Sequence, residues 1–340
     1  MVTAALPSSL ACQAKERDVT KACHKEIEQP LSKFALYVPV SVCQSPWMSC
    51  PKLLLSMGLV CACPGVSSII LAGTPRSSLP LSQIIDQACQ EAETYKDAGV
   101  DGLIVENMHD VPYMVCPGPE VTAAMAVLGA AIRQSCPRVP LGVQVLCAAN
   151  QQAIAIALAA GLDFIRAEGF VFSHVADEGI INACAGDLLR YRKHIGAENI
   201  QIFADIKKKH SAHALTADVS VAQTAAAAQL FLANGVVLTG TATGHPADPQ
   251  QLREVKHAVK IPVLVGSGVT LENVKNYLDA DALIIGSYFK KEGYWANAVD
   301  PDRAAHFCGT HSYHQCKASS EILCEIFSPI SKELMEFKNF

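Results

Sequence analysis

The sequence predicts a (β/α)₈ TIM barrel, a closed ring of eight parallel strands in which each strand is followed by a helix. From residue 66 to 306, short β-branched runs alternate with segments of helical apolar spacing. Several helical segments stop at a glycine, as at Gly99, Gly161, Gly196 and Gly235. Eight such units in about 240 residues suit a closed barrel better than an open sheet. The open doubly wound sheet is the alternative, but "ILAGTPRSSL" lacks the Gly-x-Gly-x-x-Gly that usually follows its first strand.

The composition supports buried parallel strands under a layer of helices. Half of the 340 residues are hydrophobic, while only 6% are aromatic, so the apolar mass is mainly Ala, Val, Ile and Leu. Each expected strand ends in glycine or polar residues. We expect the strands at 66–73, 100–107, 140–148, 162–169, 200–209, 235–240, 261–268 and 281–287. We expect the helices at 81–99, 119–136, 150–161, 177–196, 219–235, 248–260, 271–280 and 300–307.

The two ends of the chain differ from the repeating part. Residues 1–65 contain Pro and Ser throughout and lack clear periodicity, so we expect an irregular N-terminal extension before the 66–306 barrel. Residues 307–340 are expected to form a C-terminal tail. The uncharged run 53–73 is about as long as a membrane span, but Pro64 and Gly65 interrupt it. A turn followed by a strand is therefore favoured over a membrane span, which stays the alternative.

Charge and cysteine usage narrow the class of protein. The net charge is −5 and no long Lys/Arg run occurs, so we expect no nucleic-acid partner. The 14 cysteines are scattered through expected core elements, which indicates reduced thiols and a cytoplasmic location, with the mitochondrial matrix as the alternative. Cys308, His311, His314 and Cys316 lie close together, but their spacing fits no familiar zinc site, and we predict no metal ligand set.

Two neighbouring strands end in Gly-Ser, and this pattern predicts an anion site. Gly266, Ser267 and Gly268 follow the seventh expected strand, and Gly286 and Ser287 follow the eighth. In barrels of this kind, the loops after these two strands commonly bind phosphate through backbone N–H groups, and glycine allows close approach. The simpler explanation is that these glycines only permit tight turns.

Four charged residues near strand ends are the catalytic candidates. Asp205 and Lys207 are two residues apart, so on a strand both would face one side and could share a proton. Glu106 and Glu168 end apolar strands, where a carboxylate is costly to bury alone. Arg166 precedes Glu168 by two residues and is the expected partner, so a structural ion pair is as well supported as catalysis.

Further polar residues are expected at the same rim of the barrel. Several carboxylates beside a phosphate site would also suit Mg²⁺, but no ligand spacing indicates it and no other cofactor is predicted. Lys209 is a further candidate beside Lys207. The remaining strand-end candidates are Asn107, Asp110, Asn150, Arg166, His210, Thr239 and Thr241.

The chain resembles the BtpA/SgcQ family. The resemblance rests on "GVDGLIVENMHDVPY", "FIRAEGFVFSHVADEGII", "IFADIKKKHSAH", "LTGTATG" and "VGSGVTLENV", and it covers about residues 74–305. The family is similar to the ribulose-phosphate-binding barrels, and that likeness implies phosphate binding at Gly266–Gly268 and Gly286–Ser287. The usual first-strand motif of the family is replaced here by "VSSIILA". A barrel with such a first strand would be less stable or lack part of its site.

Two functions follow as expectations. The first is an enzyme acting on a small phosphorylated metabolite, a sugar phosphate or a nucleotide, as a lyase, isomerase or hydrolase. The second, implied by the family's cyanobacterial namesake in photosystem I biogenesis, is a non-catalytic assembly factor. Polar residues at nearly every strand end favour the enzyme, since a scaffold does not need them. The sequence leaves homo-oligomer formation open.

Overall fold

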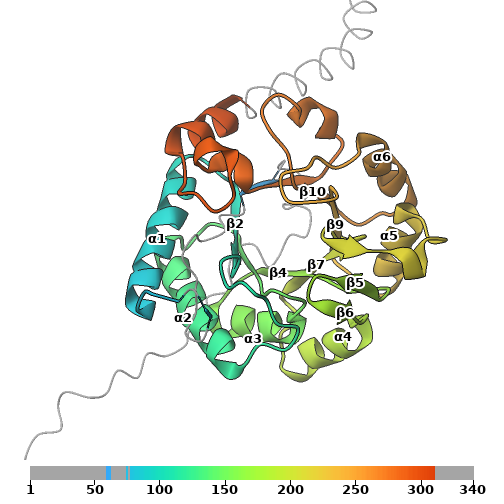
Figure 1. The fold of residues 1–340 in the computed structure, drawn as a ribbon, viewed down its shortest axis with the longest axis horizontal. Coiled ribbons are helices and arrows are strands. Elements are labelled where there is room, and N and C mark those ends of the chain that lie inside the picture. Colours follow the sequence, from blue (N-terminus) through green and yellow to red (C-terminus); the bar gives the residue numbers. More distant parts are fainter. Residues whose placement is uncertain (1–58, 63–73, 76, 311–340) are drawn as a thin grey trace, which may run out of the picture. The chain divides into compact units, whose positions relative to one another are not determined.

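The computed structural model describes residues 59–62, 74–75 and 77–310, and they form a closed barrel (Figure 1). Eight parallel strands pair in the order β1-β11-β10-β9-β7-β4-β3-β2. The strands surround the centre of the view and the helices lie outside them. The barrel strands are β1 (Leu59–Ala62), β2 (Gly102–Glu106), β3 (Leu141–Gln144), β4 (Phe164–Ala167), β7 (Gln201–Ile206), β9 (Gly235–Thr239), β10 (Val263–Gly266) and β11 (Ala282–Ile285).

The helices alternate with these strands along the chain. Ser220 and Gln223 form a reciprocal capping box at the start of α5, and Asp248 caps α6 ahead of Pro249. The α-helices are α1 (Leu81–Asp97), α2 (Pro119–Ser135), α3 (Asn150–Ala160), α4 (Ala185–His194), α5 (Val221–Leu230) and α6 (Pro249–Ala258). The 3-10 helices are η2 (Ala214–Thr216), η3 (Val274–Tyr277), η4 (Ser287–Phe289) and η5 (Lys291–Gly293).

The predicted barrel is confirmed, and seven of its strands lie within the expected ranges. The first strand was placed wrongly. It is Leu59–Ala62, which pairs with both β2 and β11, so the barrel begins before the expected boundary at residue 65. Four residues are too few to show a period, and the β-branched run at 66–73 gave the stronger signal. That run lies outside the described residues.

Three other local predictions were also wrong. The helix expected from Asp177 begins only at Ala185, because a small antiparallel sheet of β5 (His174–Ala176), β6 (Gly179–Ile181) and β8 (Ser211–Ala212) precedes it. The segment 271–280 forms only the short η3. At the other end, residues 301–310 are helical, and Phe307 packs on Phe289 at 5.5 Å between ring centroids, so the expected tail boundary at 307 falls inside a packed helix.

Side chains along each barrel strand point alternately outward and inward, so the barrel has two apolar cores. Residues such as Leu103, Val105 and Ile165 belong to the large core between sheet and helices. The residues between them face the barrel interior and form a second, smaller cluster. That cluster consists of Ile104, Phe164, Phe203, Val237, Leu264, Ala282 and Ile284.

Two glycines make room for the aromatic rings inside the barrel. A Cβ at Gly142 would lie 2.2 Å from the Phe164 ring, and one at Gly235 would lie 2.7 Å from the Phe203 ring. The two rings pack edge to face at 5.3 Å. Glycine at these positions is therefore a packing requirement and not a turn signal.

No helix in the described ranges is long and apolar enough to cross a membrane. The alternative of a span at 53–73 falls mostly outside these ranges, and its described part, Leu59–Ala62, is a barrel strand. Among the described cysteines, Cys89, Cys116, Cys136, Cys147 and Cys184 are thiols outside any disulfide, as the composition indicated.

We expect Gly142→Ala to destabilise the barrel by about 1–3 kcal/mol, because the added methyl overlaps the Phe164 ring. Urea unfolding of the purified protein measures this loss. The double variant Gly142→Ala/Phe164→Leu should regain part of it, since the smaller side chain vacates the overlapping space. Equal losses in the single and double variants would contradict this packing explanation.

Candidate active site

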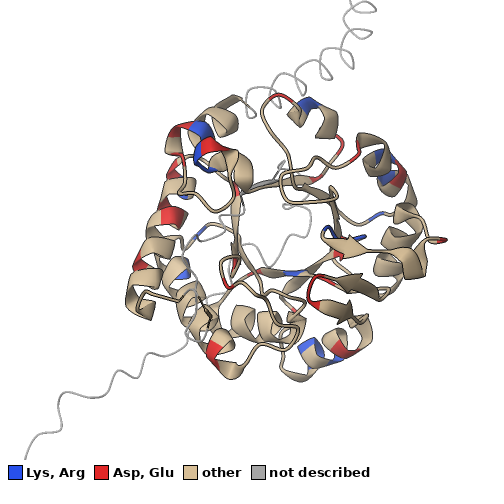
Figure 2. Ribbon diagram, viewed as in Figure 1, with Lys and Arg blue, Asp and Glu red and all other residues tan. Residues whose placement is uncertain are grey.

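The rim of the barrel interior is polar where the strands end. At the next position that faces the interior, five of the described strands carry a buried polar side chain, and glycine occupies this position at the end of β10 and just after β11. Figure 2 shows most charged residues on the outer helices, with further charged stretches on strands around the barrel centre. The buried rim residues are Glu106, Gln144, Arg166, Asp205 and Thr239. The predicted gathering of strand-end polar groups is thus present.

Arg166 ties three strands together at this rim. Its guanidinium donates to Asp205 through Nε at 2.9 Å and through a second nitrogen at 3.2 Å. A third nitrogen lies 3.4 Å from Glu106 Oε1. The sequence suggested Glu168 as the partner of Arg166, and this was wrong. In a continuous strand, the side chains of Arg166 and Glu168 would point to the same side. β4 ends at Ala167, however, so Glu168 lies beyond the strand and this alternation does not apply to it.

Glu168 is held by other neighbours. Its carboxylate accepts hydrogen bonds from Gln144 at 3.0 Å and from the Ala148 amide at 3.0 Å, and Lys208 lies 3.3 Å away. Burial raises the pKa of Glu168, and the charge of Lys208 opposes that rise. Lys208 was missed in the sequence because it sits inside the run "KKKH", which is typical of a solvated loop.

Lys207 does not pair with Asp205. Its ammonium donates to the carbonyl oxygen of Thr216 at 2.7 Å and to the Thr216 hydroxyl at 3.0 Å. β7 ends at Ile206 and Lys207 has a φ of 47°, so the strand alternation that predicted the pair no longer applies there. Burial lowers the pKa of Lys207. The prediction of an Asp205–Lys207 pair is therefore corrected to an Asp205–Arg166 pair.

The two Gly-Ser ends lie in one cavity with Glu106 and Arg166. The cavity holds about 550 Å³ of space that is partly open to solvent. Its lining residues include Lys209, Ser267, Gly268, Gly286, Ser287 and Trp295. Lys209 Nζ donates to the Ser267 hydroxyl at 3.1 Å.

Gly268 is fixed as glycine by its surroundings, whereas Gly266 is not. Gly268 has a φ of 63°, and a Cβ there would lie 2.4 Å from the backbone of His245 and Pro246. A Cβ at Gly266 would make only ordinary contacts at 3.6 Å or more. Tight turning therefore accounts for Gly268 but not for Gly266.

Lys290 was missed by the sequence prediction, whereas His109 was noted among the residues that follow the second strand. Lys290 lines this cavity, is buried, and lies 3.3 Å from Glu91 on α1. Burial lowers the pKa of Lys290, and the charge of Glu91 opposes this. The His109 ring lies 5.0 Å from the Trp295 ring. Lys290 lies five residues beyond the end of β11, where no local sequence pattern marks it as part of a site.

Three of the remaining predicted residues, Asn107, Asp110 and Asn150, hold loops in place. Asn107 holds the loop after β3, since it accepts from the Leu146 amide at 2.8 Å and donates to the Leu146 carbonyl at 3.3 Å. Asp110 accepts a hydrogen bond from Thr74, and Asn150 donates to the Glu168 carbonyl at 2.7 Å. These contacts organise loops and need no ligand to explain them.

His210 and the threonines of strand β9 lie further along the rim. The Thr243 amide donates to His210 Nε2 at 3.1 Å, and burial lowers the pKa of His210. Thr241 contacts His245 at 3.3 Å. The Thr239 hydroxyl is buried and has no partner among the described residues. His210 and Thr241 are thus engaged with their own loops, whereas Thr239 faces the barrel interior.

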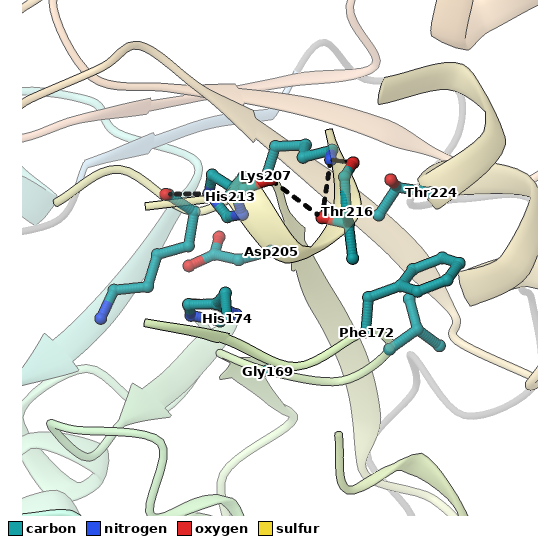
Figure 3. A pocket seen from close by; sticks show the side chains of 10 residues that line it. Gly169, Phe172, His174, Asp205, Lys207, His213, Thr216 and Thr224 are labelled. Atoms are coloured by element: carbon teal, nitrogen blue, oxygen red, sulfur yellow. Dashed lines mark hydrogen bonds between the residues drawn. The ribbon is translucent and has the colours of Figure 1, made fainter. Parts of the chain in front are cut away.

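A second, smaller cavity lies beside Asp205 (Figure 3). Asp205 borders it together with His174 from β5 and His213 beyond β8. The two histidine rings lie 5.3 Å apart. The small antiparallel sheet that positions His174 was not predicted from the sequence, because the segment looked helical.

Backbone strain gathers at this end of the barrel. Non-glycine residues with positive φ occur after β3, β4, β7 and β10. Such conformations cost about 1–3 kcal/mol each and persist where the surroundings enforce them, often at functional sites. These residues are Ala148, Phe172, Lys207, His210 and Ser267.

No group of three or more metal-ligating side chains occurs in the described ranges. Of the CGTHSYHQC cluster, only Cys308 is described, so the zinc suggestion stays untested. The Mg²⁺ suggestion also gains no ligand set, since Asp205 and Glu106 are engaged by Arg166.

A family model for the BtpA family matches residues 64–312. The chain belongs to the BtpA family. An uncharacterized mitochondrial protein of Caenorhabditis elegans is 48% identical over 242 residues, which cover 70% of this chain and 87% of that protein. The photosystem I biogenesis protein BtpA of Synechocystis is 34% identical over 230 residues, which cover 67% of this chain and 79% of that protein.

The fold also matches solved barrels at low sequence identity. Orotidine 5'-monophosphate decarboxylase of Methanocaldococcus jannaschii aligns with 74% of this chain and 98% of its own, with a TM-score of 0.48 and 16% identity. At this level of similarity, the comparison adds nothing to the topology described above.

We expect Arg166→Met to destabilise the protein by about 3–5 kcal/mol, because Glu106 and Asp205 would be left as buried charges without their counter-ion. Chemical unfolding measures the change. Arg190→Met on the exposed face of α4 is the matched control and should cost under about 0.5 kcal/mol. Equal, small effects of the two substitutions would contradict the role of the Arg166 network.

The folded protein should lose stability on acidification through His174. Burial, and then the charges of His213 and Lys208, lower the pKa of His174 below its ordinary 6.5. The unfolded chain therefore binds a proton first, so the contribution is present above about pH 6.5 and is lost as the pH falls, by up to about 1.4 kcal/mol per pH unit. Denaturant unfolding between pH 7.5 and 5 should show a shallower decline for His174→Met than for the unsubstituted protein. Equal slopes for His174→Met and the unsubstituted protein would contradict the contribution of His174.

Proposed function

We propose that this protein binds the phosphate group of a small metabolite at the Gly-Ser ends of β10 and β11 and moves a proton on it at the barrel rim. The observation that carries the proposal is that the two Gly-Ser ends, through Ser267, Gly268, Gly286 and Ser287, line one cavity with Lys209. Glycine and serine at strand ends let a phosphate approach the backbone N–H groups closely, and the serine hydroxyls and Lys209 would add donors.

The charges of the cavity suit the same ligand. Lys209, Lys290 and Arg166 border it. Arg166 is paired with Glu106 and Asp205, and Lys290 is paired with Glu91. A phosphate would gain from the Lys209 ammonium, which lies 3.1 Å from the Ser267 hydroxyl.

We assign the proton-transfer role to Glu106 first. Of the four charged catalytic candidates, Glu106 is the one that borders the cavity of the Gly-Ser ends. Arg166 would orient its carboxylate at 3.4 Å, and Asp205 would hold Arg166 in place while facing the second cavity. The contacts of Glu168 with Gln144, Ala148 and Lys208 fit a supporting role. The reaction would be that of a lyase, an isomerase or a hydrolase.

A second function is an assembly role without catalysis. The Synechocystis relative is named a photosystem I biogenesis protein, and this name is the observation in its favour. Such a role would not need amides and cations directed into a cavity, so we rank it second. The C. elegans relative is named as mitochondrial, which supports mitochondria as the location over the cytoplasm.

The proposed phosphate site predicts that inorganic phosphate and sugar phosphates raise the melting temperature of the purified full chain. A ligand at 100 times its Kd adds about 2.7 kcal/mol of stability. Gly266→Asp should abolish this shift, because a carboxylate would sit beside the anion. Gly266→Asn has nearly the same shape without the charge and should keep most of the shift.

The outcomes separate the two functions. A shift that survives in Gly266→Asp would contradict the proposed position of the phosphate. Cooperative melting with no shift for any phosphate compound would contradict the enzyme proposal and favour the assembly role.

A further inference from the structure

A loop after β11 carries an indole ring to the cavity of the Gly-Ser ends. Trp295 is one of the residues that line this cavity, and it is only partly buried. The chain pairs with itself between Lys290 and Val299, so Trp295 lies within a closed loop of residues 291–298, which we call the Trp295 loop. Small-molecule sites are commonly lined by aromatic side chains. The phosphate site proposed above does not use Trp295, so its place in the cavity needs another explanation.

The Trp295 loop is held in shape by its own hydrogen bonds. The Lys291 amide donates to the Ala298 carbonyl at 2.9 Å. The Asn297 amide donates to the Tyr294 carbonyl at 3.0 Å, and the Asn297 side chain donates to the Lys291 carbonyl at 2.9 Å. The position of the indole is therefore set without a ligand, and binding on it does not incur the entropy cost of ordering a loop.

Two further rings support the indole from sides that do not face the cavity. The His109 ring lies 5.0 Å from the Trp295 ring, and the Tyr294 ring lies 5.9 Å from it. Trp295 lines the cavity, whereas His109 and Tyr294 are not among the lining residues. Burial and the charge of Lys290 lower the pKa of His109, which favours a neutral ring that packs on the indole as an aromatic group.

The size of the cavity separates two parts of a ligand. Its enclosed part is small, and the remainder is open to solvent. The enclosed part suits a phosphate group, so the rest of a substrate must extend toward the open side. Trp295 borders both the cavity and the solvent, and it therefore lies where that second part of the substrate would be held.

The other lining residues favour a planar ring over a polyol. Arg166 is paired with Glu106 at 3.4 Å, and the Thr243 hydroxyl lies 3.0 Å from His210 Nε2. These polar side chains of the lining are thus already engaged. A polyol needs hydrogen-bond partners when it leaves water, whereas a planar ring needs only an aromatic face such as that of the indole.

We propose that Trp295 is a stacking platform for the base of a nucleotide, so that the phosphorylated substrate is a nucleotide. The phosphate lies at the Gly-Ser ends, and the base lies against the indole at the open side of the same cavity. Stacking on an aromatic side chain tolerates any base, because every base has a π-face. Trp295 therefore selects the class of ligand without selecting one base. The assignment rests on the proposed function for the phosphate half of the substrate.

The test compares the common ribonucleoside 5'-monophosphates with ribose 5-phosphate on the full chain by isothermal titration calorimetry. All of them carry the phosphate and the pentose, and only the nucleotides carry a base. We expect at least one nucleotide to bind about tenfold more tightly than ribose 5-phosphate, the usual scale for one stacked base. Trp295→Leu should remove about tenfold for that nucleotide and nothing for ribose 5-phosphate. Trp295→Phe keeps an aromatic face and should retain most of the nucleotide affinity.

The fluorescence of Trp295 reports the stacking directly. The sequence contains two tryptophans, Trp47 and Trp295, so the variant Trp47→Phe leaves Trp295 as the sole indole. We expect the tightest-binding nucleotide to quench this fluorescence on titration, because its base lies against the ring. Ribose 5-phosphate, which has no base, should leave the fluorescence nearly unchanged.

Equal affinity of every nucleotide and ribose 5-phosphate would overturn the platform while leaving the phosphate site intact. The same holds if Trp295→Leu and Trp295→Phe bind the nucleotide equally well, since an aromatic face would then not matter. The free nucleosides separate this from failure of the proposed function. If a nucleoside quenches Trp295 while no phosphate compound binds, the phosphate site is wrong and the platform stands. No quenching by any nucleoside or nucleotide overturns the platform.

Discussion

The buried guanidinium of Arg166 is the interaction on which the rim of this barrel depends. It joins β4 to β7 through Asp205 and, across β3, to β2 through Glu106. A charge buried at this depth needs partners, and the two carboxylates need it equally. The ion network therefore fixes how three strands end and which way their last inward side chains point.

The two cavities border different members of this ion network, and their other lining residues differ. On one side, Lys209 after β7 and the Gly-Ser ends of β10 and β11 border the first cavity. On the other, a small antiparallel sheet inserted after β4 brings in His174, and the segment after β8 brings in His213. A rigid, layered interior of apolar residues below the rim, including Phe164 and Phe203, holds both in place.

How much could be predicted depends on whether a feature is encoded by neighbouring residues or by residues far apart in the sequence. Seven strands and the Gly-Ser ends could be predicted because each is a local run with its own period and terminators. The pairing of Arg166 with Asp205 and Glu106 could not, because these partners are 39 and 60 residues away. The Asp205–Lys207 prediction assumed that β7 continued, whereas the strand ends at Ile206 and the chain turns at Lys207.

The sequence by itself determined the barrel, its polar rim and the position of the two Gly-Ser ends, because strand and helix periods and glycine placement act over a few residues. Only the tertiary structure decided which charges neutralise one another, where the first strand lies, and that His174 and Lys208 enter the site. Those outcomes depend on burial and on contacts between distant segments. The free energy of a buried charge or an unpaired acceptor is set by neighbours that no local pattern of residues can specify.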